Sequence, residues 1–239
     1  SGGHMKQFGV ALGDWQPPKA PDFETLSGRY VALERLETRH AHGLFRAYAG
    51  ADQLFDYLPY GPFSSEVSCI RWVGERAEEH DPYMFAVRDL ESDSAGGVMA
   101  LMRIDTANGV IELGHINLGP DLQGTRAASE AMMLLISWAF GAGYRRFEWK
   151  CDSLNMPSRR AAQRLGLSYE GTFRQATHYK GRNRDTAWFA ATDQDWPGLQ
   201  AAYEAWLRPE NFEADGQQIE RYAPTTTPEE LVKDIEGML

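Results

Sequence analysis

The residues best suited to chemistry lie in the middle of the chain. Glu112 and His115 belong to one strand-like run, residues 110–117, and Ser158 lies three residues after Asn155 at the start of a short predicted helix. Histidine and glutamate can accept a proton and a serine hydroxyl can donate one, so this set is suited to proton transfer. Strand alternation predicts that Glu112 and His115 point to opposite faces of a sheet, so that at most one of them faces a substrate.

Each of these residues also has a purely structural interpretation. His115 could be a half-buried histidine whose hydrogen bonds are satisfied within the protein. Ser158 could be a hydroxyl that binds a backbone amide, because serine is favoured near helix starts.

A second feature is the small-residue turn between this strand and a long apolar helix. It reads Leu118-Gly-Pro-Asp-Leu-Gln-Gly-Thr-Arg-Ala-Ala-Ser-Glu-Ala131. A helix start has unpaired amide hydrogens and the positive end of the helix dipole, so phosphate oxygens are stabilised there without a lysine. Ordinary strand-to-helix turns look similar, so this turn needs support from the rest of the chain.

The elements that must position these residues follow from periodicity and from Gly and Pro positions. An antiparallel meander is predicted for the strands at 84–88, 97–104 and 110–117, which polar turns separate. The sequence therefore predicts an α+β fold, with a mixed, mostly antiparallel sheet and helices on both faces. Further strands are expected at 30–36, 144–152 and from 169, and helices at 38–48, 65–79, 125–140, 155–167 and 196–207.

Three motifs occur along the chain in a fixed order. They are Gln123-Gly followed by Glu130-Ala, Asn155-x-x-Ser followed by Leu165-Gly, and Glu170-Gly-x-x-Arg. Together they resemble the GNAT N-acetyltransferases over roughly residues 27–195, and the nearest branch is the ribosomal-protein-alanine acetyltransferase (RimJ/RimL-like) type. The resemblance implies the GNAT acyl-CoA N-acyltransferase fold, acetyl-CoA as cosubstrate, no metal, and transfer to a primary amine by direct attack on the thioester.

The resemblance also implies where acetyl-CoA binds. The backbone of a splayed strand contacts the thioester and the pantetheine arm, the turn before the long helix holds the pyrophosphate, Asn155 binds the pantetheine, and Ser158 protonates the leaving thiolate. The cofactor-binding residues expected on this basis are Ile116, Asn117, Leu118, Gln123, Gly124, Thr125, Arg126, Ala127, Ala128, Asn155 and Ser158.

The chain departs from the family pattern at two positions. Arg126 stands where the first motif glycine is expected, and it either blocks the approach of a phosphate or adds a charge-assisted contact to it. We favour the contact, because Gly124, Ala127 and Ala128 leave the turn uncrowded. Thr177 stands where branch members can carry a glutamate base. His115 is therefore the expected base, with Glu112 as the alternative.

Composition narrows the function further. The net charge of −10 over 239 residues argues against nucleic-acid binding and suits a cationic amine substrate. Two cysteines, no membrane-spanning apolar run and no signal-peptide pattern indicate a cytoplasmic protein. Two basic clusters, Arg159/Arg160/Arg164 and residues 180–184, are either solvated surface or lie near coenzyme A phosphates.

The expected organisation is an N-terminal arm at 1–26, an acetyltransferase domain at 27–195 and a helical C-terminal extension at 196–239. Residues 1–4 are read as a tag remnant before a natural Met5. The acceptor is either a protein N-terminus or a small amine, and a C-terminal extension that covers part of the site would favour the small amine. A catalytically weak or inactive coenzyme A sensor is the alternative function, and a homodimer stays open as an oligomeric state.

Overall fold

The computed structural model describes residues 5–219, which form one eight-stranded sheet in the order β1-β2-β3-β4-β5-β6-β8-β7. The strands are β1 (Thr25–Ser27), β2 (Val31–Arg35), β3 (Tyr83–Asp89), β4 (Ser94–Asp105), β5 (Val110–Leu118), β6 (Arg146–Asp152), β7 (Ser168–Tyr179) and β8 (Arg182–Thr192). The helices are α1 (Ala41–Ala47), α2 (Glu66–Ala77), α3 (Arg126–Gly141), α4 (Met156–Arg164) and α5 (Trp196–Trp206), with short 3-10 helices η1 (Thr38–His40), η2 (Asp52–Phe55) and η3 (Pro209–Asn211).

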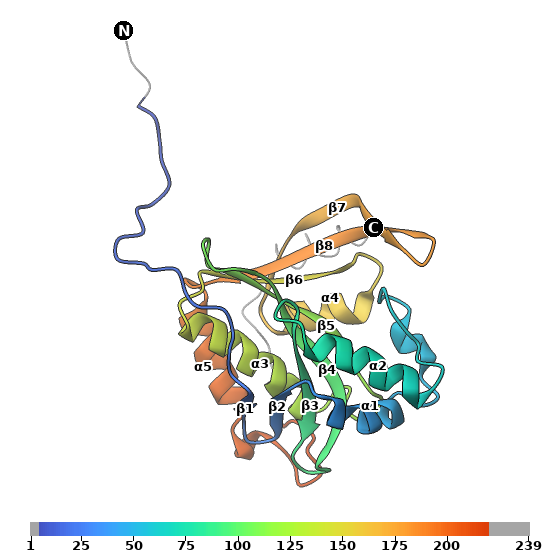
Figure 1. Ribbon diagram of the computed structural model, residues 1–239. Helices are drawn as coiled ribbons and strands as arrows, with labels where there is room; N and C mark the ends of the chain where they lie inside the picture. Colours follow the sequence, from blue (N-terminus) through green and yellow to red (C-terminus); the bar gives the residue numbers. More distant parts are fainter. Residues whose placement is uncertain (1–4, 220–239) are drawn as a thin grey trace.

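Helices cover both faces of the sheet, as Figure 1 shows. Along β3, Phe85 and Val87 pack into the core that includes α3 and α5, whereas Met84 and Ala86 pack into the core that includes α1 and α2. This alternation is the period of two expected of a strand that is buried on both sides. The predicted mixed, mostly antiparallel sheet with helices on both faces is confirmed.

The parallel pair β5 and β6 separates part-way along its length. Val110 to Leu113 pair with Arg146 to Trp149, and the pairing ends there, although β5 continues to Leu118 and β6 to Asp152. Two strands that diverge leave backbone and side chains of both accessible to a ligand between them. His115, the predicted base, lies in the part of β5 that no longer pairs with β6, and the predicted anion-binding turn follows the end of β5.

One extra residue in β5 distorts the strand at this point. Gly114 pairs with Ala100 and Asn117 with Val98, so β5 has three residue steps where β4 has two. His115 lies in this bulge with a φ of 48°. Histidine is among the few residue types that adopt the left-handed region more readily than most, and bulges of this kind re-aim a side chain.

A buried carboxylate fixes the start of α3 against the first strands. Glu130 accepts hydrogen bonds from the backbone amides of Arg29, Tyr30 and Val31, at 3.1, 2.8 and 3.2 Å. A Cβ at Gly28 would collide with the same carboxylate, so this turn needs glycine. The first turn of α3 is therefore held in place relative to the sheet.

The segments on either side of the resemblance also pack on this body. Trp15 Nε1 donates to Gly143 O at 2.9 Å, while residues before it extend away from the body in Figure 1. Tyr203 of α5 is buried in the core that contains α3, and its hydroxyl donates to Leu165 O at 2.6 Å. Part of the predicted C-terminal extension, residues 220–239, lies outside the described residues.

Candidate functional site

A groove of about 460 Å³ runs between the second half of β5, the start of α3 and α4. We call it the α3–α4 groove. Eight of the residues predicted to bind acetyl-CoA line it: Ile116, Asn117, Leu118, Gln123, Gly124, Ala128, Asn155 and Ser158. The groove thus brings together residues from elements that are far apart in the sequence.

The start of α3 presents free amides at the end of this groove, where a neighbouring cavity lined by Arg126 and Ala127 begins. Thr125 is the N-cap, and its hydroxyl accepts from the amide of Ala128 at 3.2 Å. The amides of the first helical residues, Arg126 and Ala127, have no acceptor within the helix, as at any helix start. Gly124 has a φ of 69°, and no heavy atom lies within 4 Å of a Cβ built on it. The turn therefore combines positive polarity with room for an anion.

Arg126 points away from the α3–α4 groove. Its guanidinium carbon lies 4.2 Å from the centre of the Tyr30 ring and 5.2 Å from that of Phe212. Arg126, Thr125 and Ala127 line a neighbouring cavity of about 590 Å³, which we call the α3 N-terminal cavity. Gln123, Gly124 and Arg164 line both spaces, so the two are contiguous at the helix start.

The start of α4 orients Ser158. Asn155 is the N-cap, and its Oδ1 accepts from the amide of Ser158 at 3.3 Å. Ser158 Oγ accepts from Trp149 Nε1 at 3.0 Å. The hydroxyl thus accepts from an indole rather than from a backbone amide, and the Cys151 thiol lies within hydrogen-bond reach of the same hydroxyl. Ser158 is partly exposed and faces both the groove and the cavity described next.

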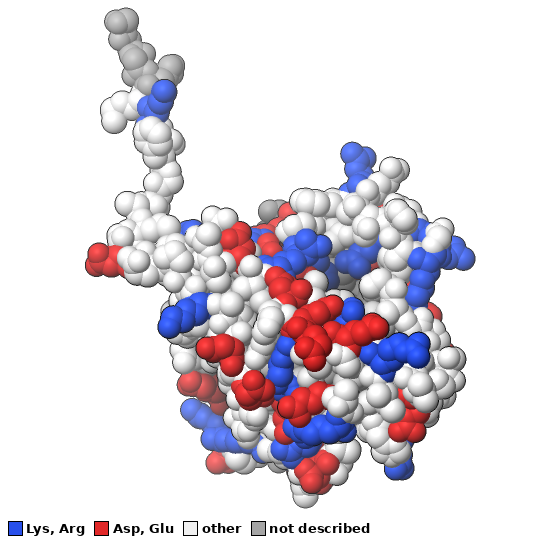
Figure 2. Space-filling view, viewed as in Figure 1, with Lys and Arg blue, Asp and Glu red and all other residues white. Residues whose placement is uncertain are grey.

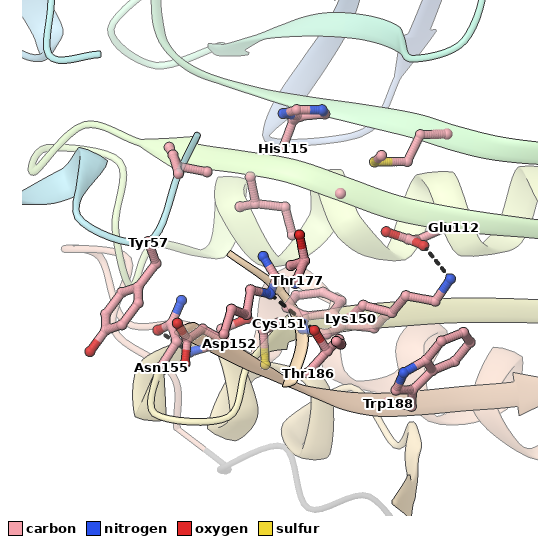
Figure 3. A pocket seen from close by; sticks show the side chains of 18 of the residues that line it. Tyr57, Glu112, His115, Lys150, Cys151, Asp152, Asn155, Thr177, Thr186 and Trp188 are labelled. Carbon is pink, nitrogen blue, oxygen red and sulfur yellow. Dashed lines mark hydrogen bonds and ion pairs between the residues drawn. The ribbon is translucent and has the colours of Figure 1, made fainter. Parts of the chain in front are cut away.

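A second space of about 500 Å³ lies over the open side of β5, β6 and β8, and we call it the sheet cavity. Figure 3 shows Glu112 pointing toward Lys150 across it. Lys150 Nζ lies 2.9 Å from Glu112 Oε1 and 3.4 Å from Glu148 Oε1. Burial raises the pKa of Glu112, and Lys150 acts in the opposite direction.

His115 lines the same cavity as Glu112, so the expected placement on opposite faces is wrong. The extra residue in the β5 bulge interrupts the alternation. Both side chains line this cavity but diverge within it. In Figure 3 Glu112 extends from β5 toward Lys150, and His115 extends away from Lys150. Burial, together with the nearby Arg76, lowers the pKa of His115 below its ordinary value, which favours the neutral form that can accept a proton.

Long-range contacts bound the sheet cavity. Lys180, at the tip of the β7–β8 hairpin, donates to Phe55 O at 2.7 Å and to Tyr60 O at 3.3 Å. Tyr179 of the same hairpin donates to Asp152 Oδ2 at 2.6 Å. Through these contacts the hairpin is tied both to the segment after η2 and to the end of β6.

The two predicted basic clusters have several roles. Arg159 is fully buried, and its Nη1 donates to Ser153 O at 3.3 Å, so it is neither solvated surface nor free for a phosphate. Arg164 donates to Ser129 Oγ at 2.5 Å and lines the α3–α4 groove. Lys180 ties the hairpin as described.

Asp185 accepts from the amide of Gln175 at 2.7 Å and so shapes the β7 side of the hairpin.

Sequence reasoning missed several cavity residues. Lys150, Asp152 and Trp188 line the sheet cavity, as do Tyr57 and Arg184. The signal for part of this set was present, since Glu148, Lys150 and Asp152 alternate with apolar residues along β6. That pattern indicates a polar sheet face.

The α3–α4 groove and the sheet cavity meet. Six residues line both, namely Tyr57, Leu58, Ile116, Trp149, Asn155 and Ser158. A ligand in the groove and another in the cavity could therefore touch at Ser158, beside the point where β5 and β6 diverge.

Within residues 5–219, no cluster of three or more His, Cys, Asp or Glu side chains is arranged to bind a metal. In the same range no helix has the length and apolar character that crossing a membrane requires.

Comparisons with known proteins agree on one family. Residues 31–168 match the family model described as an acetyltransferase (GNAT) domain. The chain is 26% identical over 178 residues to an uncharacterized N-acetyltransferase p20 of Bacillus licheniformis, covering 73% of this chain and 99% of that protein. A GCN5-related N-acetyltransferase from Brucella melitensis has 46% identity and a TM-score of 0.86, covering 88% of this chain and 97% of the other. A probable GNAT acetyltransferase from Chromobacterium violaceum has 39% identity and a TM-score of 0.76, covering 82% and 100%.

Proposed function

The chain belongs to the GNAT acetyltransferase family, and we propose that it transfers an acetyl group from acetyl-CoA to a primary amine by direct attack on the thioester. The observation that carries this proposal is the meeting of the α3–α4 groove and the sheet cavity at Ile116, Trp149, Asn155 and Ser158. A donor in the groove would present its thioester where an acceptor in the cavity can reach it.

The donor is proposed to lie along the α3–α4 groove. The pantetheine arm would run beside Ile116, Asn117 and Leu118, with Asn155 as a further polar partner. The pyrophosphate would lie against the first turn of α3, where the amides of Gly124, Arg126 and Ala127 and the helix dipole favour negative charge. No lysine is needed for this interaction.

In the proposed reaction the amine nitrogen attacks the thioester carbonyl carbon, and the carbon–sulfur bond breaks as the amide forms. The incoming ammonium must lose one proton before attack, and His115 is the proposed acceptor, directly or through a water. The departing thiolate takes a proton from the Ser158 hydroxyl, whose oxygen remains hydrogen-bonded to Trp149. The nitrogen then loses its second proton and Ser158 regains one, so the protons balance.

Glu112 is the weaker candidate for the base. Its carboxylate is paired with Lys150 at 2.9 Å and Arg103 at 3.4 Å. Both cations favour the ionised, proton-free carboxylate, but they also take up the oxygen that would have to accept the proton. His115 has no such ion pair in the described part of the chain, and burial favours its neutral form. We therefore assign the base to His115 and keep Glu112 as the variant to compare.

The placement within the family is also a proposal. The motifs at Gln123, Asn155 and Glu170 support a RimJ/RimL-like branch, for which both protein N-termini and small amines are conceivable acceptors. The described part of the C-terminal extension lies along the α3 N-terminal cavity, through Phe212 and residues 215–218, and does not line the sheet cavity. Among the described residues, the β7–β8 hairpin and the loop at Tyr57 to Pro59 are the segments that can restrict the acceptor.

Release of free coenzyme A thiol tests the function. The purified chain, acetyl-CoA and a panel of small amines and free-N-terminus peptides should release thiol faster than acetyl-CoA without an amine. Calorimetry with acetyl-CoA and coenzyme A measures binding separately. Binding without amine-dependent thiol release would identify a sensor and reject the transferase. An absence of both would reject a role for the groove in donor binding.

A further inference from the structure

We propose that the acceptor is a small primary amine that carries one carboxylate, and that Arg184 binds this carboxylate inside the sheet cavity. The inference rests on the proposed acetyl transfer and adds to it the chemical class of the acceptor. Three observations support it: the pairing state of Arg184, the charge of the cavity wall, and the tie across the β7–β8 hairpin.

Arg184 is a cation without an anionic partner in the cavity wall. It is half-buried and lines the cavity, and its Nε donates to Thr186 Oγ1 at 3.1 Å. Among residues 5–219 no carboxylate oxygen lies within the 4.0 Å ion-pair distance of its guanidinium. A guanidinium presents several N–H groups in a plane, so the Nη side of Arg184 can bind a carboxylate through two parallel hydrogen bonds.

The other charged groups of the wall already have partners. Lys150 lies between Glu112 and Glu148, and Arg103 lies 3.4 Å from Glu112. Asp152 accepts hydrogen bonds from the Tyr179 hydroxyl and from the amide of Leu154. Arg184 is thus the lining cation that a ligand can reach without breaking an ion pair.

The unpaired cation of the wall matches one carboxylate. The lining cations are Arg103, Lys150 and Arg184, and the lining carboxylates are Glu112 and Asp152. With Glu148, which pairs with Lys150, the formal charges cancel, and Arg184 is the cation left without a carboxylate at ion-pair distance. This balance contrasts with a net charge of −10 for the chain. On the face shown in Figure 2, Lys and Arg lie around the β7–β8 end and also along the lower edge, while Asp and Glu gather mainly over the centre. A phosphate monoester, at about −1.5 to −2, would carry more negative charge than one guanidinium offsets.

The hairpin tie favours a small molecule over a protein terminus. Lys180 holds the hairpin tip against the backbone at Phe55 and Tyr60 through two hydrogen bonds. The resulting cavity of about 500 Å³ has the size of a small-ligand site. An amino acid is small enough for this volume, whereas a peptide would extend beyond it.

The test compares matched acceptors and matched variants. The acceptors are β-alanine and γ-aminobutyrate, n-propylamine without the carboxylate, O-phosphoethanolamine, and a pentapeptide with a free N-terminus. The variants are Arg184→Gln and, as a control, Arg182→Gln, since Arg182 lies on the same hairpin, is exposed and does not line the cavity. Measurements are kcat/KM by thiol release and binding of each acceptor to the coenzyme A-loaded protein by calorimetry.

We expect the carboxylated amines to exceed n-propylamine about 10- to 100-fold in kcat/KM, because a charge-assisted hydrogen bond is at stake. Arg184→Gln should remove most of this difference and leave n-propylamine and coenzyme A binding unchanged, while Arg182→Gln should match the wild type. A better result with O-phosphoethanolamine or with the peptide would overturn the proposal. So would an equal loss for n-propylamine in Arg184→Gln.

The calorimetry keeps this inference separate from the transfer activity. If no amine releases thiol but carboxylated amines still bind in an Arg184-dependent manner, acetyl transfer is rejected and the binding assignment stands. If thiol is released from many amines without regard to their charge, acetyl transfer stands and the carboxylate assignment is rejected.

Discussion

The α3–α4 groove and the sheet cavity are built in different ways. The groove takes its polar contacts from two helix starts, Thr125 for α3 and Asn155 for α4, each organised by hydrogen bonds over three residues. The sheet cavity takes its side chains from five strands, a loop and the start of α4, and its shape depends on Lys180 and Phe55, which are 125 residues apart. The proposed donor site therefore takes its polar contacts from locally organised helix starts, whereas the proposed acceptor site depends on long-range contacts.

The two regions also differ in charge. The described lining of the groove contains one cation, Arg164, and no carboxylate. The sheet cavity has both signs, including the buried Glu112. The groove can therefore accept a polyanion by means of amides and a helix dipole, whereas the cavity discriminates through individual side chains.

Ser158→Ala, at the junction of the two regions, should have the largest effect. If the hydroxyl protonates the thiolate, kcat should fall roughly 1000-fold, within the range for a lost general acid, with little change in the donor Kd. Thiol-release kinetics and calorimetry measure the two quantities. The Trp149 indole would lose its acceptor, so near-UV circular dichroism should accompany the assay as a check on packing. Weakened donor binding at an unchanged kcat would make Ser158 a positioning residue.

His115→Ala should have the next largest effect. If the neutral imidazole is the base, as proposed, turnover should rise with pH through the pKa of His115, which burial places below the ordinary 6.5. The substitution should lower kcat/KM roughly 100-fold near neutral pH and remove this limb, and less should be lost at high pH, where the amine arrives neutral. A pH profile of kcat/KM gives the result.

Glu112→Gln is the matched comparison for the base. It keeps the shape of the side chain but removes the ion pair with Lys150. If this variant loses the limb while His115→Ala keeps it, the base is Glu112. If both variants keep it, the acceptor supplies its own neutral form and no side-chain base is used.

Much of the groove could be predicted from the sequence because its signals are local. Thr125 before an apolar run, and Asn155 before Pro157, are helix-start patterns, and the helices begin at Arg126 and Met156. The direction of the Arg126 side chain could not be predicted in the same way. Its ring partners, Tyr30 and Phe212, come from segments that only the fold brings together.

The sheet cavity was largely invisible to sequence reasoning. The β5 bulge arises from a register difference between two strands, and nothing in the run around His115 marks the extra residue. Alternation therefore gave the wrong face for one of Glu112 and His115. Lys180 donates to two backbone carbonyls, and because every residue has a carbonyl, the sequence does not indicate these partners.

Lys180→Ala tests whether the cavity depends on that long-range tie. Loss of its hydrogen bonds should raise KM for a small acceptor about threefold to tenfold, and donor affinity should not change, because the groove does not use the hairpin. The control is Arg182→Ala on the same hairpin. A change in the Kd of coenzyme A in Lys180→Ala would show that the two regions are mechanically coupled.

Arg126→Ala should have the smallest effect and tests the groove at its far end. The guanidinium lies over the Tyr30 ring at 4.2 Å, so it would have to give up a cation–π contact worth about 0.5 to 2 kcal/mol to reach a phosphate. We therefore expect coenzyme A to bind about threefold to tenfold more weakly in the variant, with a smaller loss for dephospho-coenzyme A if the missing phosphate is the one contacted. Arg160→Ala, an exposed change on α4, is the control. An unchanged Kd with a lower melting temperature would mean that Arg126 only ties α3 to Tyr30 and Phe212, and tighter binding would mean that it obstructs the turn.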